Sequence, residues 1–197
     1  MSRYFIFYKP YRVLCQFSQE GEKATLAHYF PGLPKNIYPV GRLDYDSEGL
    51  LILTDDKSLT ARLLDPIFAH GRTYFVQVEG QVKDEAIKEL AAGVTINVDG
   101  KKYKTKKATA RILEQEPGVP DRDPPIRFRK DIPTSWISLT LTEGKNRQVR
   151  KMTAAVGFPT LRLVRYSIGR VNIAGMRPGE YKEAGEEIKQ ALLDKAK

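Results

Sequence analysis

Residues 42–56 read RLDYDSEGLLILTDD, and this stretch joins an acidic loop to the apolar run around which the fold is expected to form. Five of its fifteen residues are carboxylates: Asp44, Asp46, Glu48, Asp55 and Asp56. The segment GLLILT has the length and apolar character of a buried strand. Asp55 or Asp56 can cap a helix after it, on which Leu59 and Leu63 share one face. The stretch therefore predicts a loop, a strand and a capped helix in succession.

Negative charge in this loop stands out because the chain as a whole is basic. Its 197 residues include 33 Lys+Arg and 24 Asp+Glu, which gives a formal net charge of +9. Such a balance indicates a polyanionic partner, with nucleic acid ahead of an anionic membrane, although a merely soluble basic domain is the alternative. With 41% hydrophobic residues, the chain can fill one sizeable core or two small lobes.

Calcium is one explanation for the acidic loop. The residues at positions 1, 3, 5, 6 and 12 of the calcium-loop pattern are Asp44, Asp46, Glu48, Gly49 and Asp55. The flanks disfavour it, because the pattern needs a helix on each side, whereas Pro39 and Gly41 precede the loop and a strand-like run follows it. Asp at position 12 also reaches bidentate geometry less easily than Glu.

Cysteine and histidine are scarce, which excludes several classes of site. Cys15 is the only cysteine, so no disulfide framework forms and a reducing cytosol is expected. With His28 and His70 as the only histidines, we expect no transition-metal site. The apolar run between Arg3 and Lys9 is too short for a signal sequence or a membrane span, which again favours a cytoplasmic protein.

Strand and helix patterns alternate without a regular βαβ order, so we expect an α+β fold with a largely antiparallel sheet. Further strands are predicted at 4–8, 73–80, 94–98, 107–113 and 136–142. Further helices are predicted at 84–93, with Asp84 as N-cap, at 146–157, with Asn146 as N-cap and Gly157 at the end, and in the last residues of the chain.

Two segments present basic side chains. A hairpin turn at Asp99-Gly100 is followed by Lys101, Lys102, Lys104, Lys106 and Lys107. These lysines either protect an exposed sheet edge or contact phosphates, and the sequence leaves both roles open. Residues 117–135 hold five prolines without a periodic pattern, and a loop of this kind with Arg122, Arg127, Arg129 and Lys130 suits an RNA-facing flap.

The predicted helix at 146–157 is amphipathic in an informative way. Val149, Met152 and Val156 form an apolar side, whereas Arg147, Arg150 and Lys151 form a basic one. A basic helical face usually means only solvation. An arginine placed beside a carboxylate, however, keeps that carboxylate ionised and oriented, and the acidic loop offers such a partner.

Taken together, GRLDYDSEGLLILTDD, RTYFVQVEG and LTEGKNRQVRKM, followed by GFPTLRLVRYSIG and PGEY, resemble the motif series of the RsuA-type pseudouridine synthases in order and spacing. The resemblance extends from FYKP at 7–10 to RPGEYKE at 177–183. The insert PPIRFRKDIPTSW most resembles the RluE branch, which acts on large-subunit ribosomal RNA. Most relatives also have an N-terminal S4 RNA-binding domain, whereas this chain opens directly on catalytic-domain sequence, as the RluE branch does.

The resemblance implies roles for individual residues. Asp44 corresponds to the catalytic carboxylate, Tyr74 to the tyrosine that stacks on the target base, and Arg150 to the arginine that pairs with the aspartate. Leu163 corresponds to the apolar residue beneath the site. Substrate-binding roles are expected for Arg42, Arg147, Leu163, Lys101, Lys102, Arg127 and Arg129. Without the resemblance, Asp44 would be interpreted as a turn or cap residue, Tyr74 as a strand aromatic and Leu163 as core.

Two mild departures from the family pattern leave these assignments in place. The chain has Arg72 where the family usually has lysine, and Asp46-Ser47 where it usually has threonine or Asp-Thr. The implied fold is the pseudouridine synthase catalytic domain over residues 1–187, with two lobes sharing one sheet, a central basic cleft and the insert at 117–135. Residues 188–197 are expected to form a helix end and tail.

The implied reaction breaks the N-glycosidic bond of a uridine, turns the detached base and rejoins it through carbon, so no cofactor and no metal are needed. The carboxylate acts either as a nucleophile on the ribose or as a base, and the sequence leaves both routes open. The expected partner is ribosomal RNA, with no membrane and a monomeric enzyme. The alternatives are a non-catalytic ribosome-assembly factor on the same fold and a small-subunit ribosomal RNA synthase.

Overall fold

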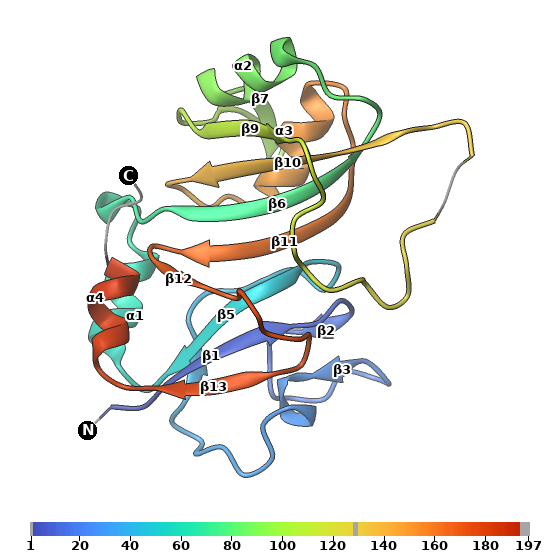
Figure 1. The fold of residues 1–197 in the computed structure, drawn as a ribbon. Coiled ribbons are helices and arrows are strands. Elements are labelled where there is room, and N and C mark those ends of the chain that lie inside the picture. The colour runs from blue at the N-terminus through green and yellow to red at the C-terminus, as the bar shows by residue number, and fades with distance from the viewer. Residues whose placement is uncertain (1, 128–129, 194–197) are drawn as a thin grey trace. The chain divides into compact units, whose positions relative to one another are not determined.

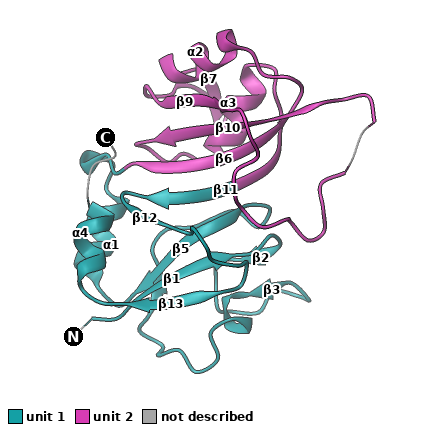
Figure 2. Ribbon diagram, in the orientation of Figure 1, with its two compact units in different colours: residues 1–70, 164–197 teal, residues 71–163 magenta. Residues whose placement is uncertain are grey.

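The computed structural model describes residues 2–127 and 130–193. Within these residues the chain divides into two compact units, which Figure 2 colours separately. Unit 1 contains residues 1–70 and 164–197, and unit 2 contains residues 71–163. Each unit contains strands and helices of its own (Figure 1), and each is described separately below.

Unit 1 contains a sheet with the strand order β13-β1-β5-β11. Its four strands are β1 (Tyr4–Lys9), β5 (Glu48–Thr54), β11 (Thr160–Ile168, which begins in unit 2) and β13 (Tyr181–Ala184). β1 pairs antiparallel with both β5 and β13, whereas β5 pairs parallel with β11. The short strands of this unit are β2 (Val13–Leu14), β3 (Ala24–Thr25), β4 (Tyr38–Pro39) and β12 (Val171–Asn172). Its helices are α1 (Lys57–Leu64), α4 (Glu187–Leu193) and the single 3-10 turns η1 (Leu26–His28) and η2 (Pro66–Phe68).

The apolar run of the acidic stretch is the central strand of this sheet. Every residue of β5 is buried, which confirms the strand predicted from GLLILT. At Gly49, with φ 108°, a Cβ would lie within 3 Å of the backbone of Arg165, so only glycine allows the two strands this approach. Leu59 and Leu63 of α1 are both buried, as their shared helical face predicts.

Unit 2 has a second group of strands in the antiparallel order β6-β10-β9. These strands are β6 (Arg72–Glu79), β10 (Thr134–Leu141) and β9 (Thr109–Leu113). A separate hairpin joins β7 (Thr95–Val98) to β8 (Lys101–Lys104), and the helices are α2 (Asp84–Ala92) and α3 (Gln148–Ala155). The buried core of this unit brings strand residues such as Val76 and Leu139 together with Leu90 of α2 and Met152 of α3.

Most predicted elements are found within one or two residues of their expected bounds, and three local predictions are wrong. The N-cap of α2 is Lys83, and Asp84 is instead in the first turn, where its charge favours the helix dipole. The N-cap of α3 is Arg147 rather than Asn146. The strand β11 was not predicted, because Arg162 and Arg165 interrupt its apolar pattern, although both side chains are buried.

The fold class is confirmed as α+β with mainly antiparallel pairing; the parallel pairs are β5 with β11 and β2 with β3. The calcium-loop geometry does not form, because Glu48 and Gly49, which the pattern would place in the loop, already belong to β5. Among the residues that the structure describes, no helix is long and apolar enough to cross a membrane.

Candidate active site

Asp44 lies in the loop between β4 and β5. Leu43 just before it is buried, Asp44 itself is partly exposed, and the amide of Ser47 donates to the carbonyl of Asp44 over 3.0 Å. This bond turns the chain directly into β5, whose first residue is Glu48. The loop therefore holds the Asp44 side chain at the surface between a buried leucine and a fully buried strand.

The segment after β1 supports this loop through backbone contacts. The amide of Arg12 donates to the carbonyl of Tyr45 over 2.8 Å, and the amide of Leu43 donates to Cys15 Sγ over 3.3 Å. The residues on either side of Asp44 are thus both tied to the segment that follows β1. This arrangement fixes the backbone from which the Asp44 carboxylate projects.

A buried lysine gives one reason for the negative charge of the loop. Lys9 has no exposed surface, and its ammonium donates to the carbonyls of Pro10 and Val13 at 2.8 Å each. Burial lowers the pKa of Lys9 to about 8, while the charges of Cys15 and of Glu48, Asp46 and Asp44 oppose that shift. The carboxylates of the acidic loop therefore help to keep this buried ammonium protonated.

The acidic residues at the far end of the stretch have a structural role. Asp56 is the N-cap of α1, as predicted for Asp55 or Asp56, and its carboxylate accepts a bond from the amide of Leu59. Asp46 lies in the turn before β5, again as predicted. The expectation that the remaining acids all serve caps and turns is wrong for Glu48, which is 2% exposed within β5.

Tyr74 and Leu163 belong to unit 2. Tyr74 lies on β6 opposite Leu139 of β10, is partly exposed and packs against the core of the unit. Leu163 is 5% exposed in the same core, which also contains Val149 and Met152 of α3. A partly exposed aromatic ring on a rigid strand suits base stacking, and the buried leucine suits a supporting role.

The predicted basic helix is present as α3, with Val149 and Met152 buried and Val156 packed against the core as the pattern predicts. Arg147 precedes the helix with φ 52°, in the left-handed region, and is exposed. Asn146 does not cap the helix; the side chain of Gln148 instead accepts a bond from the amide of Lys145 over 2.9 Å. Arg150 lies one turn into α3 and is partly exposed.

Glu143 anchors this loop, and sequence reasoning missed it. Its carboxylate is 5% exposed and accepts bonds from the Tyr103 hydroxyl, the Lys106 amide and the Gln148 side-chain amide, at 2.5, 2.8 and 2.7 Å. Burial raises the pKa of Glu143, but these hydrogen bonds outweigh it and hold the pKa below its usual value. One buried charge thus joins the end of the lysine hairpin to the loop before α3.

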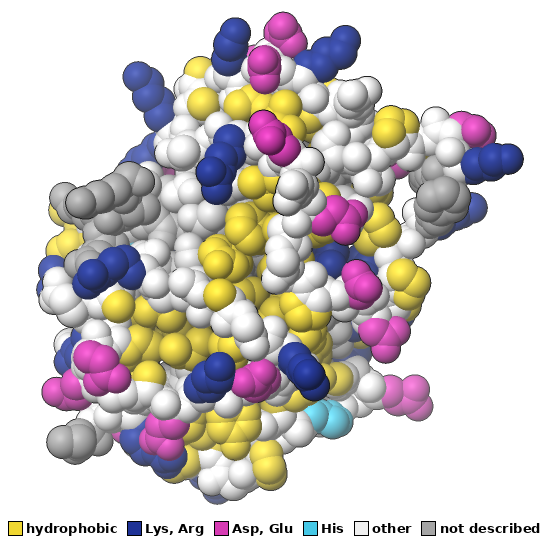
Figure 3. All heavy atoms as spheres, in the orientation of Figure 1, with side chains coloured by type: hydrophobic (Ala, Val, Ile, Leu, Met, Phe, Trp, Pro, Cys, Tyr) yellow, Lys and Arg dark blue, Asp and Glu magenta, His cyan; other side chains and the backbone are white. Residues whose placement is uncertain are grey.

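The hairpin has the expected form, with β7 and β8 antiparallel around Asp99-Gly100. Lys101 and Lys102 are exposed, whereas the Lys104 ammonium donates to the carbonyl of Gly93 over 2.6 Å. On the face shown in Figure 3, lysine and arginine side chains are scattered among acidic ones rather than gathered in one block. The hairpin is therefore a local concentration of charge.

The insert at 117–135 is tied to β11 at its first half. The buried Arg162 donates to the carbonyl of Pro120 over 2.7 Å, and its guanidinium lies 5.9 Å from the ring centre of Trp136. Arg127 is exposed beyond this attachment, whereas Arg129 lies outside the described residues. Figure 1 shows the insert extending away from the strands of unit 2.

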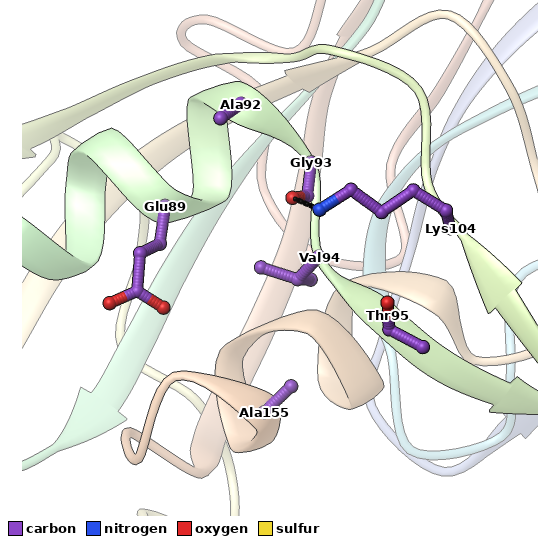
Figure 4. A pocket seen from close by; sticks show the side chains of 7 residues that line it. All are labelled: Glu89, Ala92, Gly93, Val94, Thr95, Lys104 and Ala155. Carbon is purple, nitrogen blue, oxygen red and sulfur yellow. Dashed lines mark hydrogen bonds between the residues drawn. The ribbon is translucent and has the colours of Figure 1, made fainter.

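A hollow of about 330 Å³ lies in unit 2 between the end of α2, the start of β7 and α3 (Figure 4). It is open to solvent, and none of the predicted site residues lines it. Lys104 at its rim is already bonded to Gly93. Among the described residues, no group of three or more His, Cys, Asp or Glu side chains could hold a metal ion.

The two units divide the predicted site residues between them. Asp44 and Arg42 belong to unit 1, and the partners expected for them, Tyr74, Arg147, Arg150 and Leu163, belong to unit 2. Unit 2 brings Tyr74, Leu163 and α3 into one core. The pairing of Asp44 with Arg150 joins the two units and stays a prediction.

Comparison with known proteins identifies the family. Residues 3–155 match the model of the RNA pseudouridylate synthase family. A Xanthomonas campestris protein named ribosomal large subunit pseudouridine synthase E is 50% identical over 88% of this chain and 91% of its own. A Vibrio parahaemolyticus protein of the same name is 46% identical over 90% of this chain and 72% of its own. A solved pseudouridylate synthase structure matches with a TM-score of 0.79 and 28% identity over 98% of this chain and 74% of its own.

The chain therefore belongs to the RNA pseudouridylate synthase family, and it is an isomerase. This confirms the resemblance drawn from the three separated motifs. The comparisons do not favour a non-catalytic assembly factor or a small-subunit enzyme, since the Xanthomonas and Vibrio relatives are named for the large subunit.

Proposed function

We propose that this protein converts one uridine of large-subunit ribosomal RNA to pseudouridine, with Asp44 as the catalytic carboxylate. The observation that supports the substrate is the relative named ribosomal large subunit pseudouridine synthase E, which is 50% identical over 88% of this chain. Identity at half of the aligned positions across nearly the full length supports the same reaction on the same class of RNA.

The position of Asp44 supports its catalytic role. It is partly exposed at the end of a loop whose backbone is bonded on both sides to the segment after β1. Isomerisation requires a group that acts on the ribose while the glycosidic bond breaks and the base turns, and a carboxylate fixed in this way can act there. The reaction exchanges no electrons and transfers no group from a donor, so the carboxylate and the RNA are sufficient.

The RNA must leave its helix to reach the carboxylate, which requires a stacking surface and contacts to phosphates. Tyr74 provides the stacking ring, and Leu163 packs beneath it in the core of unit 2. Arg150 orients Asp44, and Arg42 and Arg147 contact the substrate. Lys101, Lys102, Arg127 and Arg129 bind phosphates further away, so that the hairpin and the insert supply much of the grip.

We further propose that residues 1–187 form the catalytic domain and that the enzyme acts as a monomer in the cytoplasm, where its ribosomal substrate is assembled. The single cysteine fits that reducing compartment.

The test uses Asp44→Asn, which preserves size and removes charge. We expect pseudouridine formation on a large-subunit RNA transcript to fall below detection while RNA affinity changes less than about twofold, because Asp44 acts on the ribose and not on phosphates. Asp55→Asn is the matched control, since it removes a carboxylate from the same stretch at the other end of β5. An Asp44→Asn variant as active as the wild type would overturn the assignment. A wild type that binds this RNA without modifying any uridine would favour the non-catalytic binder.

A further inference from the structure

Arg12 has a backbone conformation that arginine rarely adopts. Its φ is 58°, in the left-handed region where an L side chain costs about 1–2 kcal/mol and glycine costs nothing. Among the described residues, four non-glycine residues have positive φ: Arg12, Ala69, Asp99 and Arg147. Asp99 is a common residue for a hairpin turn. Two of the other three are exposed arginines, and Arg147 is already expected at the substrate.

The strained turn is fixed on both sides of Arg12. The buried ammonium of Lys9 donates to the carbonyl of Pro10 before it and to that of Val13 after it, each over 2.8 Å. The amide of Arg12 itself donates to the carbonyl of Tyr45, the residue that follows Asp44. The position of Arg12 is therefore coupled directly to the loop that carries the catalytic carboxylate.

The side chain of Arg12 is exposed, and its guanidinium lies 5.4 Å from the centre of the Tyr11 ring. A ring below an arginine limits its motion and leaves its donors directed to solvent. Lys23, which lies 5.7 Å from the ring of Tyr45, differs because its ammonium is paired with Glu20. Arg12 is thus the better placed of these two cations for an anion from outside.

Rigid, strained residues next to a reacting group are characteristic of functional sites, because a folded protein retains such strain where the side chain is needed. From these contacts we infer that Arg12 is a substrate-contacting residue, whose guanidinium binds a phosphate of the RNA backbone beside the target uridine. This inference rests on the proposed function and adds a contact on unit 1 to the lysine hairpin and α3 on unit 2. A phosphate contact positions the RNA and does not read its sequence.

Three variants separate the charge of Arg12 from its strain. Arg12→Gly removes both, Arg12→Gln removes the charge and keeps the strained backbone, and Arg12→Lys keeps charge and strain. Ala69→Gly is the matched control, because Ala69 has φ 51° in the same unit and carries no charge. We expect Arg12→Gly and Ala69→Gly to melt at or above the wild-type temperature.

The readouts are affinity for a large-subunit RNA transcript between 50 and 200 mM salt and steady-state pseudouridine formation. Arg12→Gly and Arg12→Gln should each raise Kd and KM about three- to tenfold, lower the slope of log affinity against log salt by about 0.7–1, and leave kcat within about twofold. Arg12→Lys should bind within about twofold of the wild type, and Ala69→Gly should bind as the wild type does. Wild-type binding and salt slope in both Arg12→Gly and Arg12→Gln would overturn the inference while leaving the proposed function standing. A wild type that neither binds nor modifies the RNA would overturn both.

Discussion

Replacing Asp56 with alanine should destabilise unit 1 strongly, although the residue lies in the same acidic stretch as Asp44. Its carboxylate is 8% exposed and accepts four bonds: from the Tyr4 hydroxyl, the Leu59 amide, the Ser58 hydroxyl and the Lys189 ammonium, at 2.8, 2.9, 2.8 and 2.7 Å. It thereby connects β1, the start of α1 and α4 through a single charge.

The expected cost follows from what alanine leaves behind. Loss of the helix cap costs about 1 kcal/mol, and the fully buried Tyr4 loses its acceptor, which costs about 1–2 kcal/mol. The pair with Lys189, which is 35% exposed, adds about 0.5 kcal/mol. We expect a total near 3 kcal/mol and a fall in Tm of roughly 6–12 °C for a chain of this size.

Scanning calorimetry of Asp56→Ala beside Asp55→Ala provides the measurement. The bonds that Asp55 accepts, from the Arg3 amide and the Asn36 side chain, are exposed to solvent, so its loss should cost under about 1 kcal/mol. Equal and small effects of the two variants would refute the assignment of Asp56 as the structural anchor.

The same residue predicts a pH dependence. Burial raises the pKa of Asp56, but the bonds from Lys189, Leu59, Ser58 and Tyr4 outweigh it and hold the pKa well below its unfolded value. The stabilisation is therefore fully present above the unfolded pKa of about 3.9 and is lost as the pH falls below it. The wild type should lose more stability than Asp56→Ala between pH 5 and pH 2, and parallel curves would contradict this reasoning.

Two further predictions concern RNA binding. Reversing the charge at both Lys101 and Lys102 should weaken binding and reduce the salt slope by roughly one unit for each phosphate that the variant no longer binds, whereas Lys88→Glu on the exposed face of α2 should change the slope little; filter binding at several salt concentrations decides, and equal slopes in the two variants would leave the hairpin lysines as protection of the sheet edge. Tyr74→Ala should lower kcat/KM about ten- to a hundredfold by loss of base stacking, and Tyr74→Phe should retain most of it; if alanine and phenylalanine lower kcat/KM equally, the ring does not stack on the base.

The regular parts of the fold could be predicted from sequence because their patterns are local. The fully apolar β5 and the alternating faces of α1 and α3 follow from residue type and spacing alone. β11 could not, since two of its buried residues are arginines. Arg165 donates to the carbonyl of Leu50 and Arg162 to that of Pro120, and both acceptors are remote in sequence. Burial of a charge through a distant partner has no local signature.

The candidate site shows the same division. Motifs alone indicate Asp44, Tyr74 and Arg150, yet the contacts that support them have no such signal. Glu143 is an unremarkable acid in the sequence until Tyr103 and Gln148 are seen to bond to it. Residue type assigns the N-cap of α3 to Asn146, whereas the Gln148 side chain forms the bond that shapes that loop. Such contacts depend on the tertiary structure and not on the local sequence.

The most direct test of the proposed function is a map of pseudouridines in ribosomal RNA from cells that lack this gene, with the gene restored as wild type or as Asp44→Asn. We predict that one large-subunit pseudouridine disappears in the deletion, returns with the wild type and stays absent with Asp44→Asn, while small-subunit RNA and tRNA are unchanged. An unchanged map in the deletion, or return of the site with Asp44→Asn, would contradict the proposal.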